Sequence, residues 1–310
     1  MSATPTFTIV MPAFNAAPTI APAIRSVFAQ TREDFQLVVV DDGSTDETAQ
    51  RIRPFEADSR LEVVRQPNRG LAAARNTAIE RAQGRFVSML DSDDLWLPRY
   101  LEVMAETLER DPKAGFAYTD AWLLDDARRR ILRASAMAYQ DPPEVPPADA
   151  RAFLEELLQR NFVFTSATVR RSVLQEVGGY RESLAASEDY ELWLRIVARG
   201  YRGARAPGRL AVYRKRPGTL STDEPRMFSS MREVARIVAE EYDVPPAIRD
   251  LARARMTSLN AAVTSDGRAL SVRYRIRAQL VQLKRAVLSP WLWHRDLPAE
   301  IRAAFPDLAR

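Results

Sequence analysis

The first 90 residues alternate short apolar runs with segments whose apolar residues recur every three or four positions. Runs that are apolar throughout predict strands buried on both sheet faces, and the helical spacing predicts amphipathic helices between them. We expect strands at residues 7–11, 35–40, 61–65 and 86–90. Strands that alternate with helices in this order indicate an α/β fold with an open, mostly parallel central sheet.

The pattern continues beyond this point with longer interruptions. Further strands are expected at 116–124, 162–169 and 210–213, and further helices at 101–108, 153–158, 188–197 and 248–263. Helix formers dominate from Pro225 onward, so we expect one domain at 1–222 and a helical C-terminal extension at 223–310. The segment 137–148 holds four prolines and is expected to be a mobile loop.

Polar residues follow three of the first four expected strands. Asn15 follows the first strand, Asp41 and Asp42 follow the second, and residues 91–94 (Asp-Ser-Asp-Asp) follow the fourth. Ligands of open α/β sheets bind beyond the carboxyl ends of the strands, where these residues should meet. Three carboxylates in four positions repel one another, and an all-oxygen set suits Mg²⁺ or Mn²⁺. We therefore expect a cation there, together with phosphate; the alternative is a solvated acidic loop that caps the next helix.

Composition narrows the class of protein. The 310 residues are 46% hydrophobic and 28% charged, as in ordinary soluble domains, and the net charge of +4 is too small to argue for nucleic acid. With no cysteine and one histidine, the chain has no disulfide, no thiolate nucleophile and no zinc–thiolate site. We see neither a signal peptide nor an apolar run of membrane-spanning length, so we expect a cytoplasmic protein.

The segment 269–288 carries five basic residues and no acid, interleaved with apolar ones. Such a helix can lie on an anionic membrane surface, which would place the protein peripherally at the inner membrane face. The interpretation we favour is a helix that packs on the main domain and exposes its basic face to solvent.

Several short motifs stand in the order and spacing of a known family. They are FTIVMPAFN at 7–15, VVVDDGSTD at 38–46, NRGLAAARN at 68–76, DSDD at 91–94, GGY at 178–180, and ED at 188–189 followed by LWLR at 192–195. Together they resemble the family-two inverting glycosyltransferases with the GT-A fold, over roughly residues 5–222. Each motif is common alone, and their combination is specific.

The resemblance implies a nucleotide-binding role for the residues after the first three strands. Asp42 resembles the carboxylate that accepts a hydrogen bond from the base edge. Pro12, Ala13 and Asn15 are expected to line the base-and-ribose pocket, and Arg75 resembles an arginine near the nucleotide. The local alternatives are that Asp42 only caps the turn that follows it, and that Arg75 is exposed or pairs with Asp42.

The resemblance also implies the metal ligands and the base. Asp91 and Asp93 look like the ends of a DxD signature, with Asp93 on the metal and Asp91 on the ribose or the metal's waters. Asp94 is expected to support sugar or acceptor binding. Asp189 is similar to the family's catalytic base, although Glu188 and Asp189 could be a plain acidic helix N-terminus. Trp193 is expected in the core.

The implied activity is that of a metal-dependent, hexosyltransferase-like enzyme. It would move a sugar from a nucleotide-diphospho-sugar, expected to be a UDP-sugar, to a hydroxyl of a glycan or lipid-linked acceptor in cell-surface polysaccharide synthesis. A divalent ion would neutralise the leaving diphosphate, and a carboxylate would accept the hydroxyl proton. The alternative is a catalytically silent sugar-nucleotide or glycan-binding protein on the same fold.

One position departs from the family pattern. Family members often have Tyr-Arg-x-His-Pro-Gly in the loop after the last strand, and Arg216 stands here in place of the histidine. A third metal ligand from this loop is therefore not expected. The guanidinium could contact the diphosphate, or the loop could be a solvated basic segment.

Overall fold

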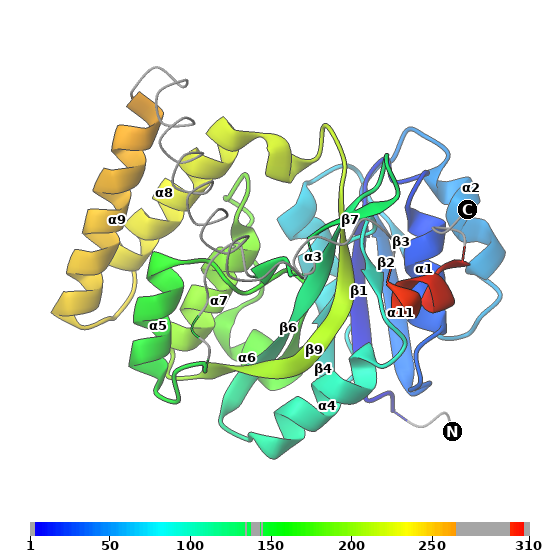
Figure 1. Ribbon diagram of the computed structural model, residues 1–310, viewed down its shortest axis with the longest axis horizontal. Helices are drawn as coiled ribbons and strands as arrows, with labels where there is room; N and C mark the ends of the chain where they lie inside the picture. The colour runs from blue at the N-terminus through cyan, green and yellow to red at the C-terminus, as the bar shows by residue number, and fades with distance from the viewer. Residues whose placement is uncertain (1–3, 134, 138–142, 144, 265–297, 307–310) are drawn as a thin grey trace.

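The chain folds around one curled sheet with helices on both faces (Figure 1). The computed structural model describes residues 4–133, 135–137, 143, 145–264 and 298–306. The strand order is β3-β2-β1-β4-β8-β6-β9-β5, and β7 pairs with β6. The parallel half consists of β1 (Phe7–Ala13), β2 (Phe35–Asp41), β3 (Leu61–Arg65) and β4 (Phe86–Met89).

Alternate side chains of these strands enter two separate cores. Val10 and Val38 pack in one cluster with α3 (Leu71–Glu80), while Ile9 and Leu37 pack in the other with α1 (Ile20–Phe28) and α4 (Tyr100–Arg110). Because both faces are covered, the strands are apolar throughout rather than alternating. The four expected strands and the helices between them are confirmed; the helix after β2 is short, with α2 at Thr48–Ile52 and a 3₁₀ turn, η1, at Arg53–Phe55.

The other half of the sheet is mixed. It consists of β5 (Leu95–Trp96), β6 (Ala114–Asp125), β7 (Arg130–Arg133), β8 (Ala167–Arg170) and β9 (Arg202–Lys215). β8 runs antiparallel to both β4 and β6, whereas β9 runs parallel to β6.

Two sequence predictions in this half were wrong in extent. The strand expected at 162–169 begins only at Ala167, because Phe162 and Val163 bury their side chains in the core without joining the ladder. The strand expected at 210–213 is β9, which begins at Arg202. Exposed Arg205 between the buried residues Ala204 and Ala206 breaks the apolar run by which a strand would be recognised.

Helices α5 (Ala150–Gln159), α6 (Arg171–Val177), α7 (Glu188–Ala198), α8 (Glu224–Glu240) and α9 (Pro246–Thr264) cover one end of the sheet, opposite to α2 (Figure 1). Trp193 is fully buried, as expected. Val234 and Ile248 of α8 and α9 belong to the same apolar cluster as Trp193, so these helices pack directly on the main core. The domain boundary at 222 and 223 stays a prediction.

The C-terminal helix α11 (Ala299–Ala304) returns to the sheet. Its Ile301 is buried against Trp122, Leu124 and Val212. The basic segment at 269–288 lies outside the described residues, as does half of the proline-rich segment at 137–148. Within the described residues, no helix combines the length and the apolar character needed to cross a membrane.

Candidate active site

A pocket of about 780 Å³ opens beyond the carboxyl ends of β1, β2 and β4. Nine of the ten residues that the sequence singled out line it: Pro12, Ala13, Asn15, Asp42, Arg75, Asp91, Asp93, Asp189 and Arg216. The tenth, Asp94, is buried and does not line the pocket. Residues as far apart in the sequence as positions 12 and 216 meet in this pocket, because the carboxyl ends of the parallel strands lie at one edge of the sheet.

One end of the pocket is formed by the loops after β1 and β2, which are tied to each other. The amide of Asn15 donates to Ser44 Oγ at 3.0 Å, and Asn15 Oδ1 accepts from the amide of Thr45 at 2.9 Å. Asn15 has φ 49°, a left-handed conformation that asparagine tolerates. This pairing fixes the backbone that precedes α1.

Asp42 orders the loop after β3. Its Oδ1 accepts from the amide of Arg69 at 2.9 Å and from the side chain of Gln66 at 2.8 Å, and its Oδ2 accepts from the amide of Gly70 at 2.8 Å. The turn after β2 is held by Asp41, whose carboxylate accepts from the amide of Ser44. Asp42 thus does not cap that turn, and it lies on the pocket wall.

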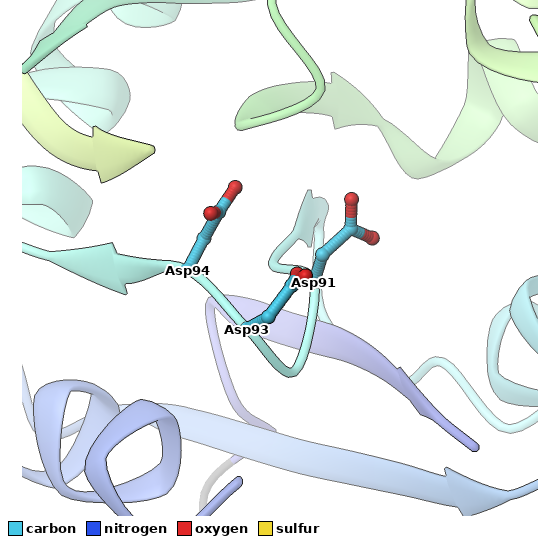
Figure 2. Close-up of side chains that lie close together, drawn as sticks. All are labelled: Asp91, Asp93 and Asp94. Carbon is cyan, nitrogen blue, oxygen red and sulfur yellow. The ribbon is translucent and has the colours of Figure 1, made fainter. Parts of the chain in front are cut away.

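Three carboxylates gather in the turn after β4 (Figure 2). Asp91, Asp93 and Asp94 each place an oxygen within 4.8 Å of the other two. Burial is the main cause that raises the pKa of Asp93, and repulsion from Asp91 adds to it. The pKa of Asp94 is raised well above the usual range, mainly by burial and then by repulsion from Asp93. Asp94 accepts a hydrogen bond from the amide of Arg214 at 3.0 Å, so it anchors β9 to this turn.

Arg75 joins this turn to α7. Its side chain is 1% exposed, one Nη pairs with Asp91 at 2.6 Å, and the other pairs with Glu188. Its guanidinium also lies 5.1 Å from the ring centre of Tyr180. Burial alone would lower its pKa, but Asp91, Tyr180, Glu188 and Asp189 together raise it well above its ordinary value. Arg75 is therefore neither exposed nor paired with Asp42.

Asp189 stands at the start of α7, partly exposed to the pocket. Its Oδ2 accepts from Thr165 Oγ1 at 3.0 Å, and its Oδ1 accepts from the amide of Tyr190 at 2.7 Å. Burial and the nearby Glu188 raise the pKa of Asp189 to about 6, although Arg75 and the two hydrogen bonds act in the opposite direction. A carboxylate with this pKa is ionised at neutral pH and is basic enough to accept a proton.

The loop after β9 closes the pocket on the side of the acidic turn. Arg216 Nη2 pairs with Asp93 Oδ2 at 3.1 Å, whereas Arg214 is buried and pairs with Asp126 at 2.7 Å. From the sequence, we expected the side chain of Arg216 to face either a bound diphosphate or solvent. In the structure it instead pairs with Asp93 on the pocket wall.

Sequence reasoning missed several residues of the pocket. Glu188 was identified only as a helix start, and the roles of Thr165 and Ser187 were not foreseen. Arg226 and Met227 of α8 also line the pocket, so the expected C-terminal extension contributes to it through this helix. The local signal for Ser187 is its place directly before the two acids that open α7; its left-handed φ of 58° is visible only in the structure.

The donor atoms of the acidic turn fit a hard divalent cation. Asp91 and Asp93 offer carboxylate oxygens on the pocket wall, and the described residues place no thiolate or imidazole beside them. Oxygen ligands are those preferred by Mg²⁺ and Mn²⁺. Asp91, Asp93, Glu188 and Asp189 make this wall acidic, so an anionic ligand needs an accompanying cation to approach it.

A model of the family described as "Glycosyl transferase family 2" matches residues 8–178, which is more than half of the chain. The chain belongs to this family. The succinoglycan biosynthesis protein ExoU of Rhizobium meliloti is 36% identical over 204 residues, which are 63% of this chain and 57% of that protein. The Escherichia coli β-1,3-glucosyltransferase WfgD is 44% identical over 96 residues, 31% of this chain and 38% of that protein. Both alignments thus span less than two thirds of the relative's length.

Solved structures share the fold. The mannosyltransferase PcManGT from Pyrobaculum calidifontis, in complex with GDP-Man and Mn²⁺, aligns with a TM-score of 0.65 and 22% identity, covering 94% of this chain and 82% of that one. TarS of S. aureus in complex with UDP-GlcNAc aligns with a TM-score of 0.63 and 19% identity, covering 90% and 79%. The expected GT-A fold, with its α/β sheet flanked by helices, is confirmed.

Proposed function

We propose that this family 2 protein is an inverting glycosyltransferase that moves a sugar from a nucleotide-diphospho-sugar to an acceptor hydroxyl in polysaccharide synthesis. The observation that carries the proposal is the convergence of Asp42, Asp93 and Asp189 on one pocket at the carboxyl edge of the sheet. These three carboxylates come from the loop after β2, the turn after β4 and the start of α7, and they would supply a base-recognition group, a cation ligand and a proton acceptor.

The donor's nucleotide would occupy the end of the pocket formed by Pro12, Ala13, Asn15 and Asp42. The three N–H groups on Asp42 hold its carboxylate in a fixed position. A fixed carboxylate can accept a hydrogen bond from the base edge, as a UDP-sugar would offer. The related structures named above hold UDP-GlcNAc and GDP-Man, so both uracil and guanine donors are candidates.

Asp93 and Asp91 would hold Mn²⁺ or Mg²⁺ against the diphosphate. When bound, the ion supplies positive charge to the leaving nucleoside diphosphate. Arg75 would not contact the nucleotide directly in this arrangement, because both of its Nη groups already bind Asp91 and Glu188. Its contribution is to fix Asp91 relative to the start of α7, so that the cation ligand and the base keep one geometry.

Asp189 would accept the proton of the attacking hydroxyl. Thr165 orients one of its oxygens, and its pKa of about 6 keeps it ionised at neutral pH. If Asp189 acts as the base and no covalent intermediate forms, the hydroxyl attacks in line and the anomeric carbon is inverted. The acceptor would enter past Arg226 and Met227 of α8. A glycan or lipid-linked acceptor is consistent with WfgD, whose name gives a diphosphoundecaprenol-linked substrate; a peripheral membrane contact through 269–288 stays a prediction.

A thermal-shift screen of nucleoside diphosphates, each with and without Mn²⁺, tests the donor proposal. A ligand at one hundred times its dissociation constant stabilises the protein by about 2.7 kcal/mol. We expect one base to raise the melting temperature, and only when Mn²⁺ is present. Stabilisation by no nucleoside diphosphate under either condition would contradict the proposed function.

A further inference from the structure

Arg216 is bound to the carboxylate that the proposed cation would use. Its Nη2 lies 3.1 Å from Asp93 Oδ2, and the two side chains are only 26% and 28% exposed. Its Nε is buried and has no hydrogen-bond partner among the described residues. The guanidinium is therefore held by a single ion pair, with part of its donor capacity unused.

The other guanidinium groups of the pocket are already engaged or stand apart from this turn. Arg75 binds Asp91 and Glu188, Arg214 binds Asp126, and Arg226 donates to a backbone carbonyl in the loop before α7. Asp93 thus depends on Arg216 for compensation of its charge. A divalent cation and a guanidinium on the same carboxylate would repel each other because both are positively charged, and they would compete for the negative charge of Asp93.

From this competition we propose that Arg216 is a donor-positioning residue that holds Asp93 until a divalent cation displaces it, and that it then binds the donor's diphosphate. The inference rests on the proposed function. The diphosphate carries at least two negative charges beside the turn, and a planar guanidinium binds phosphate oxygens through two donors at once. The guanidinium of Arg216 thus exchanges one anionic partner, the carboxylate of Asp93, for another, the diphosphate of the donor.

The loop is built so that the side chain can turn while its backbone stays in place. Thr219 Oγ1 donates to the carbonyl of Arg216 at 3.1 Å, and Tyr213 Oη donates to Ser221 Oγ at 2.7 Å. Gly218 takes the left-handed φ of 78° that closes the turn between them. These bonds hold residues 213–221 together without using the guanidinium.

Two binding measurements on Arg216→Gln test the proposal. Binding of Mn²⁺ alone, followed by electron paramagnetic resonance, is expected to tighten on the order of fivefold, because the competitor for Asp93 is gone. Calorimetry with saturating Mn²⁺ and the nucleoside diphosphate selected by the thermal-shift screen is expected to show binding weakened on the order of tenfold. Arg216→Lys keeps the charge without the fork, so Mn²⁺ binding should stay near wild type and the nucleotide should bind a few-fold more weakly.

Lys215→Gln is the matched control, since it removes the same charge from an exposed neighbour that does not line the pocket. It should change neither constant. Opposite signs for the two ligands in Arg216→Gln are the distinguishing result. If both affinities fall, both rise or neither moves, the proposed exchange of partners is wrong. If the wild type binds neither Mn²⁺ nor any nucleoside diphosphate, the proposed function fails instead.

Discussion

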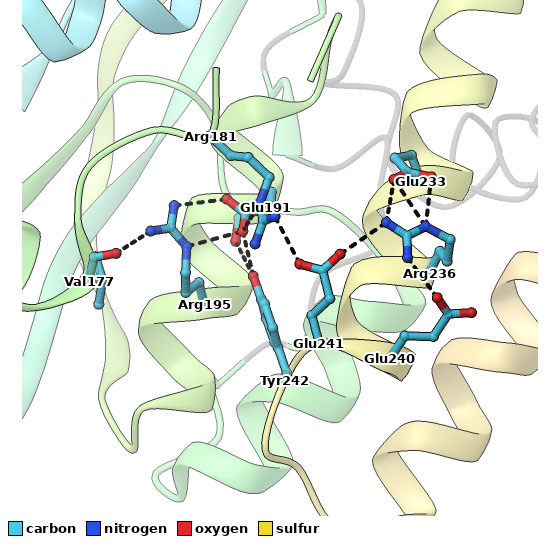
Figure 3. Close-up of polar contacts among 9 residues, drawn as sticks. All are labelled: Val177, Arg181, Glu191, Arg195, Glu233, Arg236, Glu240, Glu241 and Tyr242. Atoms are coloured by element: carbon cyan, nitrogen blue, oxygen red, sulfur yellow. Dashed lines mark hydrogen bonds and ion pairs between the residues drawn. The ribbon is translucent and has the colours of Figure 1, made fainter. Parts of the chain in front are cut away.

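Helix α7 carries two acids, Asp189 and Glu191, that lie two residues apart and have opposite environments. Glu191 is 0% exposed and is surrounded by donors: Arg195 at 2.9 Å, Arg181 at 3.4 Å and the Tyr242 hydroxyl at 2.7 Å (Figure 3). Asp189 faces the pocket, where its side-chain partner is the neutral hydroxyl of Thr165. Glu191 is compensated by ion pairs with two arginines, whereas Asp189 is uncompensated in the sense that it has no ion-pair partner among the described residues.

The surroundings of Glu191 show what compensation achieves. Arg195 also donates to the carbonyls of Val177 and Gly179, and Arg181 continues to Glu241. The network therefore ties α7 to the end of α6 and to the α8–α9 connection, and none of its residues lines the pocket described above. We propose that the charge balance around Glu191 serves the stability of the fold, whereas the raised pKa of Asp189 beside the pocket supports its proposed role as the base.

Removal of the uncompensated acid should have the largest effect on activity. In Asp189→Asn the carboxamide has no basicity, so release of nucleoside diphosphate from the donor should fall at least about 10³-fold. Binding of the nucleoside diphosphate should stay within about twofold of wild type, because Asp42 and the acidic turn are intact. Transfer at the wild-type rate would show that Asp189 is not the base. A wild type that binds the donor and never turns over would support the silent binding protein.

Removal of the compensated acid should instead reduce stability. Glu191→Gln leaves the guanidinium groups of Arg181 and Arg195 without their shared charge, and breaking such a buried pair costs about 3 kcal/mol. Urea unfolding measures this loss as a lower midpoint at constant slope. Glu240→Gln is the control, because it removes an acid from the exposed end of the same network, where it pairs with Arg236. Its cost should stay within about 1 kcal/mol.

Urea unfolding of Asp189→Asn tests whether the two acids of α7 affect stability in opposite directions. Burial raises the pKa of Asp189, so its ionised form costs stability at neutral pH, and the amide should raise the urea midpoint. Two substitutions on one helix turn should therefore shift stability in opposite directions. A loss of stability in both would mean that Asp189 is structural as well.

The local sequence pattern predicts where most of the site residues lie, but it does not predict which side chains pair with one another. Apolar strands followed by acids placed Asp42, Asp91 and Asp93 at one edge, since parallel strands share that edge. The partner of Arg75 could not be predicted, because Glu188 lies 113 residues further along the chain. Nothing in the local sequence separates Asp93, on the pocket wall, from the adjacent Asp94, whose carboxylate binds the amide of Arg214. The difference between the two aspartates depends on how β9, which lies about 120 residues further along the chain, aligns with this turn.

The smallest predicted effect concerns the pH dependence of the reaction. Because the pKa of Asp189 is about 6, kcat/KM should fall as pH drops through 6 and should be about tenfold below its plateau at pH 5. The direction follows from the role: the base is active only when ionised, and acid protonates it. The measurement is the pH profile of nucleoside diphosphate release at low donor concentration, with Mn²⁺ held saturating.

Thr165 gives this profile a second, independent test. Its hydrogen bond lowers the pKa of Asp189, so Thr165→Val should move the acid limb to higher pH, on the order of half a unit. Thr165→Ser keeps the hydroxyl and should leave the limb in place. A limb that stays unmoved in Thr165→Val, or that shifts to lower pH, would show that the group titrating near pH 6 is not the carboxylate at the start of α7.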